Sequence, residues 1–139
     1  MAALIAREGL DVAADRALGH YTHEKSSLGC AAALETIDVI ETEALLARAN
    51  RLGARALERL RAMQASLPAI VEVRGVGLLL AVELAKAVKA EEAMYRCLEK
   101  GLSFKVGQGN VIVLAPPLVI DERDLERALD IVEEAIRDG

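Results

Sequence analysis

Aromatic side chains are almost absent from this sequence of 139 residues, which contains one Phe, two Tyr and no Trp. Aromatic rings usually supply much of the buried area of a core. The core must therefore be built mainly from Ala, Leu, Val and Ile. Hydrophobic residues make up 53% of the chain, which suffices for one domain of ordinary size.

Clustered positive charge is also missing. The net charge is -5 and the Lys and Arg residues are scattered, which argues against a nucleic-acid partner. No stretch approaches the roughly 20 apolar residues that span a bilayer, and Arg7 and Glu8 argue against a signal peptide. The only cysteines, Cys30 and Cys97, fall at apolar positions of expected helices. We therefore expect a cytoplasmic protein with two buried, reduced thiols and no membrane partner.

Most of the unusual polar chemistry lies in one segment, GHYTHEKSSLGCAAA over residues 19–33. A run of His, Thr, Glu, Lys and Ser has no packing purpose, so we interpret it as a loop that presents polar groups to a ligand. The helix that follows should begin at Ser26 or Ser27, because either hydroxyl can cap it. Its first residues are apolar on nearly every side, which predicts that its start is buried all round.

The remaining pattern predicts the order helix, helix, strand, strand, helix, strand, strand, helix. The expected features are a short strand over 2–6, a turn at Glu8-Gly9, a short helix from Asp11, an N-cap at Thr42, an apolar stripe from Leu45 to Leu60, strands over 70–74 and 78–84, a helix over 86–100 closed by Gly101, a hairpin of 102–106 with 111–115, and a last helix capped by Asp121. Hairpins with a single helical crossover favour an α+β fold, with a small antiparallel or mixed sheet and helices packed on one face.

Two further features of the sequence, a pair of glycines and a row of arginines, are better explained by structure than by ligand binding. The segment Gly75-Val76-Gly77 lacks the third glycine of a dinucleotide loop and lies between two strands, so it indicates a turn or bulge. A row of arginines lies along the second expected helix, mostly off its apolar stripe. We interpret this row as a solvated face rather than an anion site. Its members are Arg48, Arg51, Arg55, Arg59 and Arg61.

The polar loop itself matches no standard catalytic or metal-binding pattern. Its candidate metal ligands, His20, His23, Glu24 and Cys30, have no standard spacing. No nucleophile elbow accompanies its serines. Nothing near Lys25 in the sequence would desolvate it, which argues against a Schiff base at that position. We assign no catalytic residue and no metal ligand.

Three stretches in a fixed order carry a family resemblance. They read YTHEKSSLGCAAA over 21–33, VRGVGLLLAVEL over 73–84 and LAPPLVIDERDL over 114–125. Together they resemble the C-terminal part of class III pyridoxal-phosphate-dependent aminotransferases, the group of ornithine, acetylornithine and 4-aminobutyrate aminotransferases.

The resemblance implies an assignment of domains and one binding residue. Residues 27–139 would form the small C-terminal domain of a fold-type I enzyme, and residues 1–26 would be a remnant of the large domain with its interface and phosphate loop. Thr22 would bind the phosphate of pyridoxal 5'-phosphate in the neighbouring subunit of a homo-oligomer. A hydroxyl near a helix N-terminus suits such a role.

The sequence departs from the family pattern in three places. The Schiff-base lysine and the large cofactor domain would precede Met1, and the family's Asn-Pro is replaced by Ser26-Ser27. Val113 stands three residues before the Pro-Pro pair, where many members carry an arginine for a substrate carboxylate. We therefore predict the C-terminal portion of an aminotransferase, incomplete and inactive as an isolated chain. The alternatives are a non-catalytic truncated product or interaction subunit that needs a large-domain partner, and a regulatory α+β module that binds a small molecule.

Overall fold

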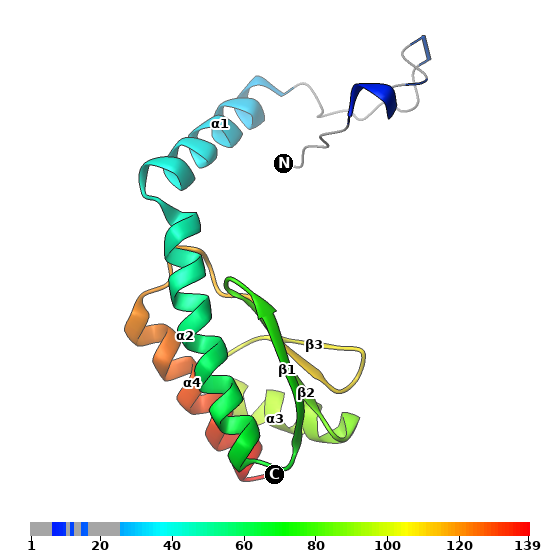
Figure 1. The fold of residues 1–139 in the computed structure, drawn as a ribbon, viewed down its shortest axis with the longest axis vertical. Helices are drawn as coiled ribbons and strands as arrows, with labels where there is room; N and C mark the ends of the chain where they lie inside the picture. Colours follow the sequence, from blue (N-terminus) through cyan, green and yellow to red (C-terminus); the bar gives the residue numbers. More distant parts are fainter. Residues whose placement is uncertain (1–6, 11, 13–14, 17–25) are drawn as a thin grey trace. The chain divides into compact units, whose positions relative to one another are not determined.

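The computed structural model describes residues 7–10, 12, 15–16 and 26–139 (Figure 1). Contacts divide the chain into Met1–Glu43 and Ala44–Gly139, and each unit is considered by itself. The strand expected over 2–6 and the helix expected from Asp11 lie outside the described residues. At the expected turn the backbone forms a short 3-10 helix, η1 (Glu8–Leu10), in which Leu10 N donates to Arg7 O at 2.9 Å.

Helix α1 (Ser27–Thr42) begins where the sequence predicts. The Ser26 hydroxyl oxygen accepts a hydrogen bond from Gly29 N at 3.3 Å, which caps the first turn. The prediction that this start is buried all round is wrong for this chain, because no residue of α1 is buried and Leu28 is 81% exposed. Burial requires a second packed element, and the short η1 is the one other element described in this unit.

Thr42 does not cap the second helix, so that prediction is also wrong. Its hydroxyl donates to Asp38 O at 2.7 Å within α1. Short polar side chains form this i−4 bond as readily as they cap, so their identity alone does not mark a boundary. Helix α2 (Leu45–Ser66) instead follows Ala44, whose φ of 51° and ψ of 39° are left-handed.

The second unit combines a four-stranded sheet with three helices. After α2 come β1 (Ile70–Val76), β2 (Leu79–Leu84), α3 (Ala87–Glu99), β3 (Lys105–Gly107), β4 (Val111–Leu114) and α4 (Glu122–Arg137). The strand order is β1-β2-β4-β3 and every neighbouring pair is antiparallel. The predicted α+β fold is confirmed, with the antiparallel form of the sheet. The predicted caps are also confirmed, since Gly101 has φ 83° after α3 and Asp121 accepts from Arg123 N at 2.8 Å before α4.

One face of the sheet forms the core with the helices. Helix α2 contacts β1 and β2, α3 contacts β2, β3 and β4, and both helices contact α4 (Figure 1). The predicted apolar stripes of these three helices are mostly buried, but Leu46 of α2 and Leu98 of α3 are exceptions at 68% and 54% exposed. The fully buried side chains include Leu52, Leu60, Leu80, Val82, Cys97, Ile112, Leu129 and Val132.

The turn between β1 and β2 lies slightly later than the sequence suggests. Gly75 belongs to β1, and a Cβ there would come 2.7 Å from Leu79 O. The left-handed residue is Gly77, with φ 54°. Helix α2 packs tightly against this turn, because a Cβ on Gly53 would overlap the Gly77 carbonyl and lie 2.8 Å from Gly77 Cα. Two glycines far apart in sequence therefore allow the helix to approach the hairpin.

The arginine row of α2 is exposed at Arg51, Arg55 and Arg61, as the sequence predicts, but most of the row is also paired with groups of or near α4. Four of its members bind groups on α4 or just before it, and Arg61 alone of the five is simply exposed. The carboxylates recur at near four-residue spacing along α4, so the two helices present matching rows. Arg48 Nη2 donates to Ile120 O at 2.6 Å, and Arg51 pairs with Glu122 at 3.4 Å. Arg55 pairs with Glu122 and, at 3.2 Å, with Glu126. Arg59 pairs with Asp130, with Glu126 at 2.8 Å and with Glu133 at 3.5 Å.

Candidate functional site

The predicted phosphate ligand, Thr22, lies outside the described residues. The same holds for the other polar groups of its loop, His20, His23, Glu24 and Lys25. The role of Thr22 therefore stays a prediction. The structure does describe the end of the loop, where Ser26 caps α1.

The start of α1 has the chemistry that an anion requires. Its first turn carries no acidic residue. Backbone N–H groups at a helix start lack intrahelical partners, and the helix dipole places partial positive charge there. A phosphate group held near Ser26 would meet those of these donors that Ser26 does not already cap, with no carboxylate in the first turn of α1.

The two cysteines occupy different environments. Cys30 on α1 is exposed, so the prediction that both thiols are buried is wrong for this residue. Cys97 on α3 is fully buried, as predicted, with its Sγ 3.9 Å from Ile131 O. Burial raises the pKa of the Cys97 thiol to about 11. The thiol therefore stays protonated at neutral pH, which suits packing rather than nucleophilic chemistry.

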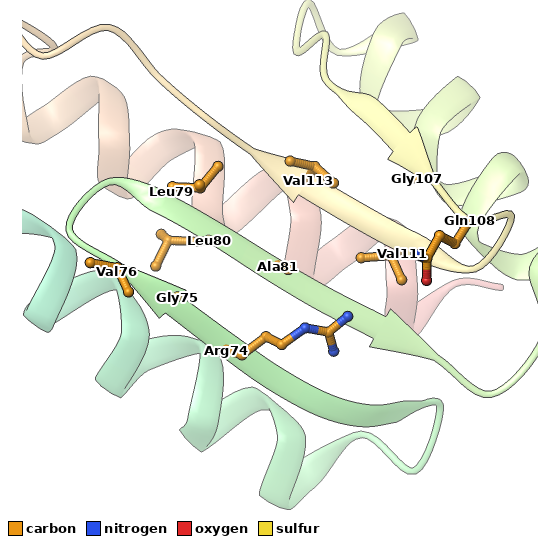
Figure 2. A pocket seen from close by; sticks show the side chains of 10 residues that line it. All are labelled: Arg74, Gly75, Val76, Leu79, Leu80, Ala81, Gly107, Gln108, Val111 and Val113. Carbon is orange, nitrogen blue, oxygen red and sulfur yellow. The ribbon is translucent and has the colours of Figure 1, made fainter. Parts of the chain in front are cut away.

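The face of the sheet that points away from the helices carries a hollow of about 640 Å³. Figure 2 shows Val76, Leu79 and Val113 arrayed along three neighbouring strands, β1, β2 and β4. Val76 is 83% exposed and Leu79 is 60% exposed. We call this surface, made by Arg74, Val76, Leu79, Ala81, Val111 and Val113 with Gly75, Gly107 and Gln108, the outer sheet face.

Arg74 is the one cation that lines this hollow, and it is already paired. Its Nη1 donates to Glu83 at 2.9 Å and lies 3.2 Å from Glu72. The hydrogen bond to Glu83 and the charge of Glu72 raise the pKa of Arg74 above its ordinary value. Asn110 Nδ2 donates to Glu83 at 3.4 Å and to Leu84 O at 3.0 Å. The guanidinium is thus held along the strands rather than presented to an incoming carboxylate.

Val113 lines this hollow from β4. It pairs with Ala81 on β2 and with Lys105 on β3. The position where many family members carry an arginine is therefore apolar and flanked by a small residue. A second hollow of about 500 Å³ lies beside β3 and the start of α4, and Phe104, Pro116, Pro117 and Ile120 help to line it.

The described part of the chain contains no group of three or more His, Cys, Asp or Glu side chains arranged to hold a metal ion. None of its helices has a stretch long and apolar enough to cross a bilayer.

Sequence reasoning missed the outer sheet face, although a signal for it was present. The runs LLAVEL in β2 and VIVL in β4 are almost continuously apolar. A strand with one face in water alternates apolar and polar residues, whereas an uninterrupted run indicates burial on both faces. The α2 and α4 charge rows could have been matched only after the two helices were known to be neighbours.

Comparison with known proteins gives a consistent family signal. The sequence model described as "Aminotransferase class-III" matches residues 3–136. The chain is 49% identical to (R)-1-hydroxy-2-aminoethylphosphonate ammonia-lyase of Vibrio splendidus, over 98% of this chain and 30% of that protein. It is 38% identical to ornithine aminotransferase 1 of Staphylococcus saprophyticus, over 78% of this chain and 27% of that protein. The solved structure of acetylornithine aminotransferase from Elizabethkingia anophelis superposes with a TM-score of 0.76 at 35% identity, over 81% of this chain and 29% of that one. The chain thus spans about 30% of the length of the relatives it matches.

Proposed function

Because the chain belongs to the class III aminotransferase family, we propose that it is the C-terminal portion of an enzyme that uses pyridoxal phosphate to move an amino group between an amine or amino acid and a 2-oxo acid. The observation that carries the proposal is the match over residues 3–136, which includes the polar loop and all but the last three residues of the unit Ala44–Gly139. When bound, the cofactor supplies an electron-withdrawing ring, and the protein supplies binding and orientation.

Within this proposal the chain's own part is phosphate binding and assembly. Thr22 would donate a hydrogen bond to the cofactor phosphate of the neighbouring subunit. The first turn of α1 carries no acidic residue and α1 begins at Ser27, five positions after Thr22, which supports this role. Residues 1–26 would belong with the large domain and residues 27–139 would form the small domain.

The test uses a hybrid enzyme in which this chain replaces the matching segment of the Vibrio splendidus relative. Thr22→Ala removes one hydrogen bond to a charged group, worth about 1.5–3 kcal/mol. Pyridoxal-phosphate affinity should therefore fall roughly ten- to hundred-fold. Thr22→Ser should keep most of the affinity because the hydroxyl makes the contact. His23→Ala and Lys25→Ala are the matched loop controls, and loss of affinity in these variants but not in Thr22→Ala would refute the assignment.

We also propose that the complete enzyme is a cytoplasmic homo-oligomer. Support comes from α1, where Leu28, Leu34 and Ile37 are 81%, 65% and 51% exposed and would be covered by assembly. Light scattering of the hybrid should give at least a dimer. A monomer at micromolar concentration would contradict this part of the proposal.

A second candidate reaction is ammonia elimination from an aminoalkylphosphonate. It is favoured by the 49% identity to the Vibrio splendidus lyase, against 38% for the ornithine aminotransferase. It also agrees with Val113, since a phosphonate substrate need not present a carboxylate to that position. The test compares two hybrids, with the remainder taken from the lyase or from the ornithine aminotransferase. The lyase hybrid should keep the larger fraction of its parent's activity and should release ammonia without a 2-oxo acid. If the ornithine aminotransferase hybrid keeps the larger fraction of its parent's activity, ammonia elimination is excluded and amino-group transfer is favoured.

A further inference from the structure

We infer that Lys105 binds the anionic group of the substrate, a phosphonate or a carboxylate, where the two hollows of the sheet unit adjoin at Val113. The inference rests on the proposed function in one respect, namely that the ligand is the substrate of the assembled enzyme. The site itself is defined by residues of this chain alone.

The first argument is the register of the sheet, which sets four residues in one row across the strands. Val113 pairs with Ala81 on one side and with Lys105 on the other, and Ala81 pairs in turn with Arg74. Directly opposed residues of an antiparallel pair lie on the same face, with Cβ atoms about 4.5–5.5 Å apart. Figure 2 shows the first three members on neighbouring strands. The row, in order, is Arg74, Ala81, Val113 and Lys105.

The second argument is the difference in charge between the two ends of this row. Arg74 is neutralised, because its Nη1 lies 2.9 Å from Glu83 and 3.2 Å from Glu72. The Lys105 side chain is exposed and makes no ion pair with any residue that the structure describes. The middle of the row, Ala81 and Val113, is apolar. The uncompensated positive charge of the row is therefore at its Lys105 end.

The third argument is the composition of the second hollow, of about 500 Å³, beside β3 and the start of α4. Lys105 is the one charged residue among those that line it, and Ser103 contributes the one hydroxyl. The other lining residues are apolar, Phe104 and Pro116 among them. Small-molecule sites combine apolar walls with a few polar groups in this way.

The two hollows together define the class of ligand. Val113 lines both of them, so they adjoin at this residue. No Asp or Glu lines either hollow, so no carboxylate of the lining opposes an anion. The arrangement suits a small molecule with one oxyanion and a short chain that carries no second negative charge. A phosphonate can carry two negative charges and a carboxylate one, so the phosphonate should be attracted more strongly.

The test uses the Vibrio splendidus hybrid described above and two probes that lack an amine. Ethylphosphonate and propionate share a short apolar chain and differ in the anionic group, so calorimetric titration measures binding apart from reaction. Lys105→Met removes the charge and keeps a long side chain, whereas Lys105→Arg keeps the charge. Lys86→Met is the matched control, because Lys86 is also exposed but lines neither hollow.

We expect Lys105→Met to raise the Kd for ethylphosphonate roughly ten- to hundred-fold, since it removes a hydrogen bond between charged groups. Lys105→Arg should stay within about fivefold of the unaltered hybrid, and Lys86→Met within about twofold. Ethylphosphonate should bind more tightly than propionate, and the reverse order would keep Lys105 in this role with a carboxylate as its ligand. The inference is overturned if Lys105→Met changes the Kd for both probes by less than about twofold, or if Lys105→Arg loses as much affinity as Lys105→Met.

Two further measurements separate the substrate from the cofactor and the inference from the proposed function. The pyridoxal-phosphate affinity of the hybrid should not change in Lys105→Met, and a fall would assign Lys105 to the cofactor phosphate and overturn the inference. In an active hybrid, Lys105→Met should raise KM far more than it changes kcat, because the contact binds substrate and transition state alike. An unchanged KM in an active hybrid rejects the inference alone. Weakened ethylphosphonate binding in an inactive hybrid rejects only the proposed function.

Should the hybrid be insoluble, the isolated chain is titrated with ethylphosphonate and followed by the NMR shifts of its backbone amides. Shifts at Ser103, Lys105 and Val113 that disappear in Lys105→Met would support the site, because all three residues belong to this chain. Shifts that are retained in Lys105→Met, or that are absent up to about 100 mM ethylphosphonate, would overturn it.

Discussion

The contact between Gly53 and Gly77 gives a sharp prediction about stability. In an unconstrained helix, Gly→Ala would stabilise by about 1 kcal/mol through helix propensity. Here the new Cβ would overlap the Gly77 carbonyl and lie 2.8 Å from Gly77 Cα. The obstacle is backbone, which cannot rotate away as a side chain could, so the helix or the hairpin must shift. Overpacking of this kind costs about 3 kcal/mol at the upper end of the usual range.

The net expectation for Gly53→Ala is therefore a loss of about 2 kcal/mol in the free energy of unfolding. Urea denaturation followed by far-UV circular dichroism measures it, and the midpoint should fall by roughly 1 M for an ordinary m-value. Ala54→Gly is the matched control, because Ala54 is an exposed neighbour in the same helix and reports propensity alone. If Gly53→Ala is as stable as the wild type or more so, the close approach of α2 to the hairpin is refuted.

Three further predictions concern the core and the ion pairs. Arg59→Met should lower the free energy of unfolding by about 1 kcal/mol, because Arg59 bridges several carboxylates of α4. This loss should shrink when unfolding is measured in concentrated NaCl, and a loss that does not depend on salt would contradict an ionic origin. Leu60→Ala, at a fully buried site, should cost about 2–5 kcal/mol in urea denaturation, while Leu46→Ala, at a site 68% exposed, should change stability by less than about 0.5 kcal/mol; similar losses would contradict the assigned core. The folded state raises the pKa of Cys97 from 9.0 to about 11, so it favours the protonated thiol, and its contribution should be complete below pH 9 and lost as the pH rises toward 11. Cys97→Ala should flatten that part of the stability profile measured by denaturation, and an unchanged slope would refute this cause.

Features set by a few neighbouring residues were predictable. The caps at Ser26 and Asp121, the left-handed Gly101 and the hairpin turn before Asn110 all depend on side chains or glycines within a few positions. Backbone groups at helix ends and turns must find partners close by in the chain, so local sequence determines where they lie. Thr42 shows the limit of this reasoning, because one hydroxyl can satisfy either of two local arrangements.

Features that depend on remote partners were not predictable in the same way. The arginines of α2 meet carboxylates about 70 positions later in the sequence, for example Arg59 with Glu126. Whether a charged row is solvated or paired depends on which helix lies beside it. The same reason explains Cys30 and α1, since an apolar helix is buried only where another element covers it.

The sequence by itself determined the α+β class, the apolar stripes, most element ends and the family, because these depend on periodicity, capping chemistry and the three motifs. The family resemblance also predicts that Thr22 binds the cofactor phosphate, and Thr22 lies outside the described residues. Only the tertiary structure decided the strand order β1-β2-β4-β3, the approach of Gly53 to Gly77, the pairing of α2 with α4 and the apolar outer face around Leu79 and Val113. Each of these brings together residues distant in sequence, and their juxtaposition is set by packing of the whole unit rather than by the preferences of any one segment.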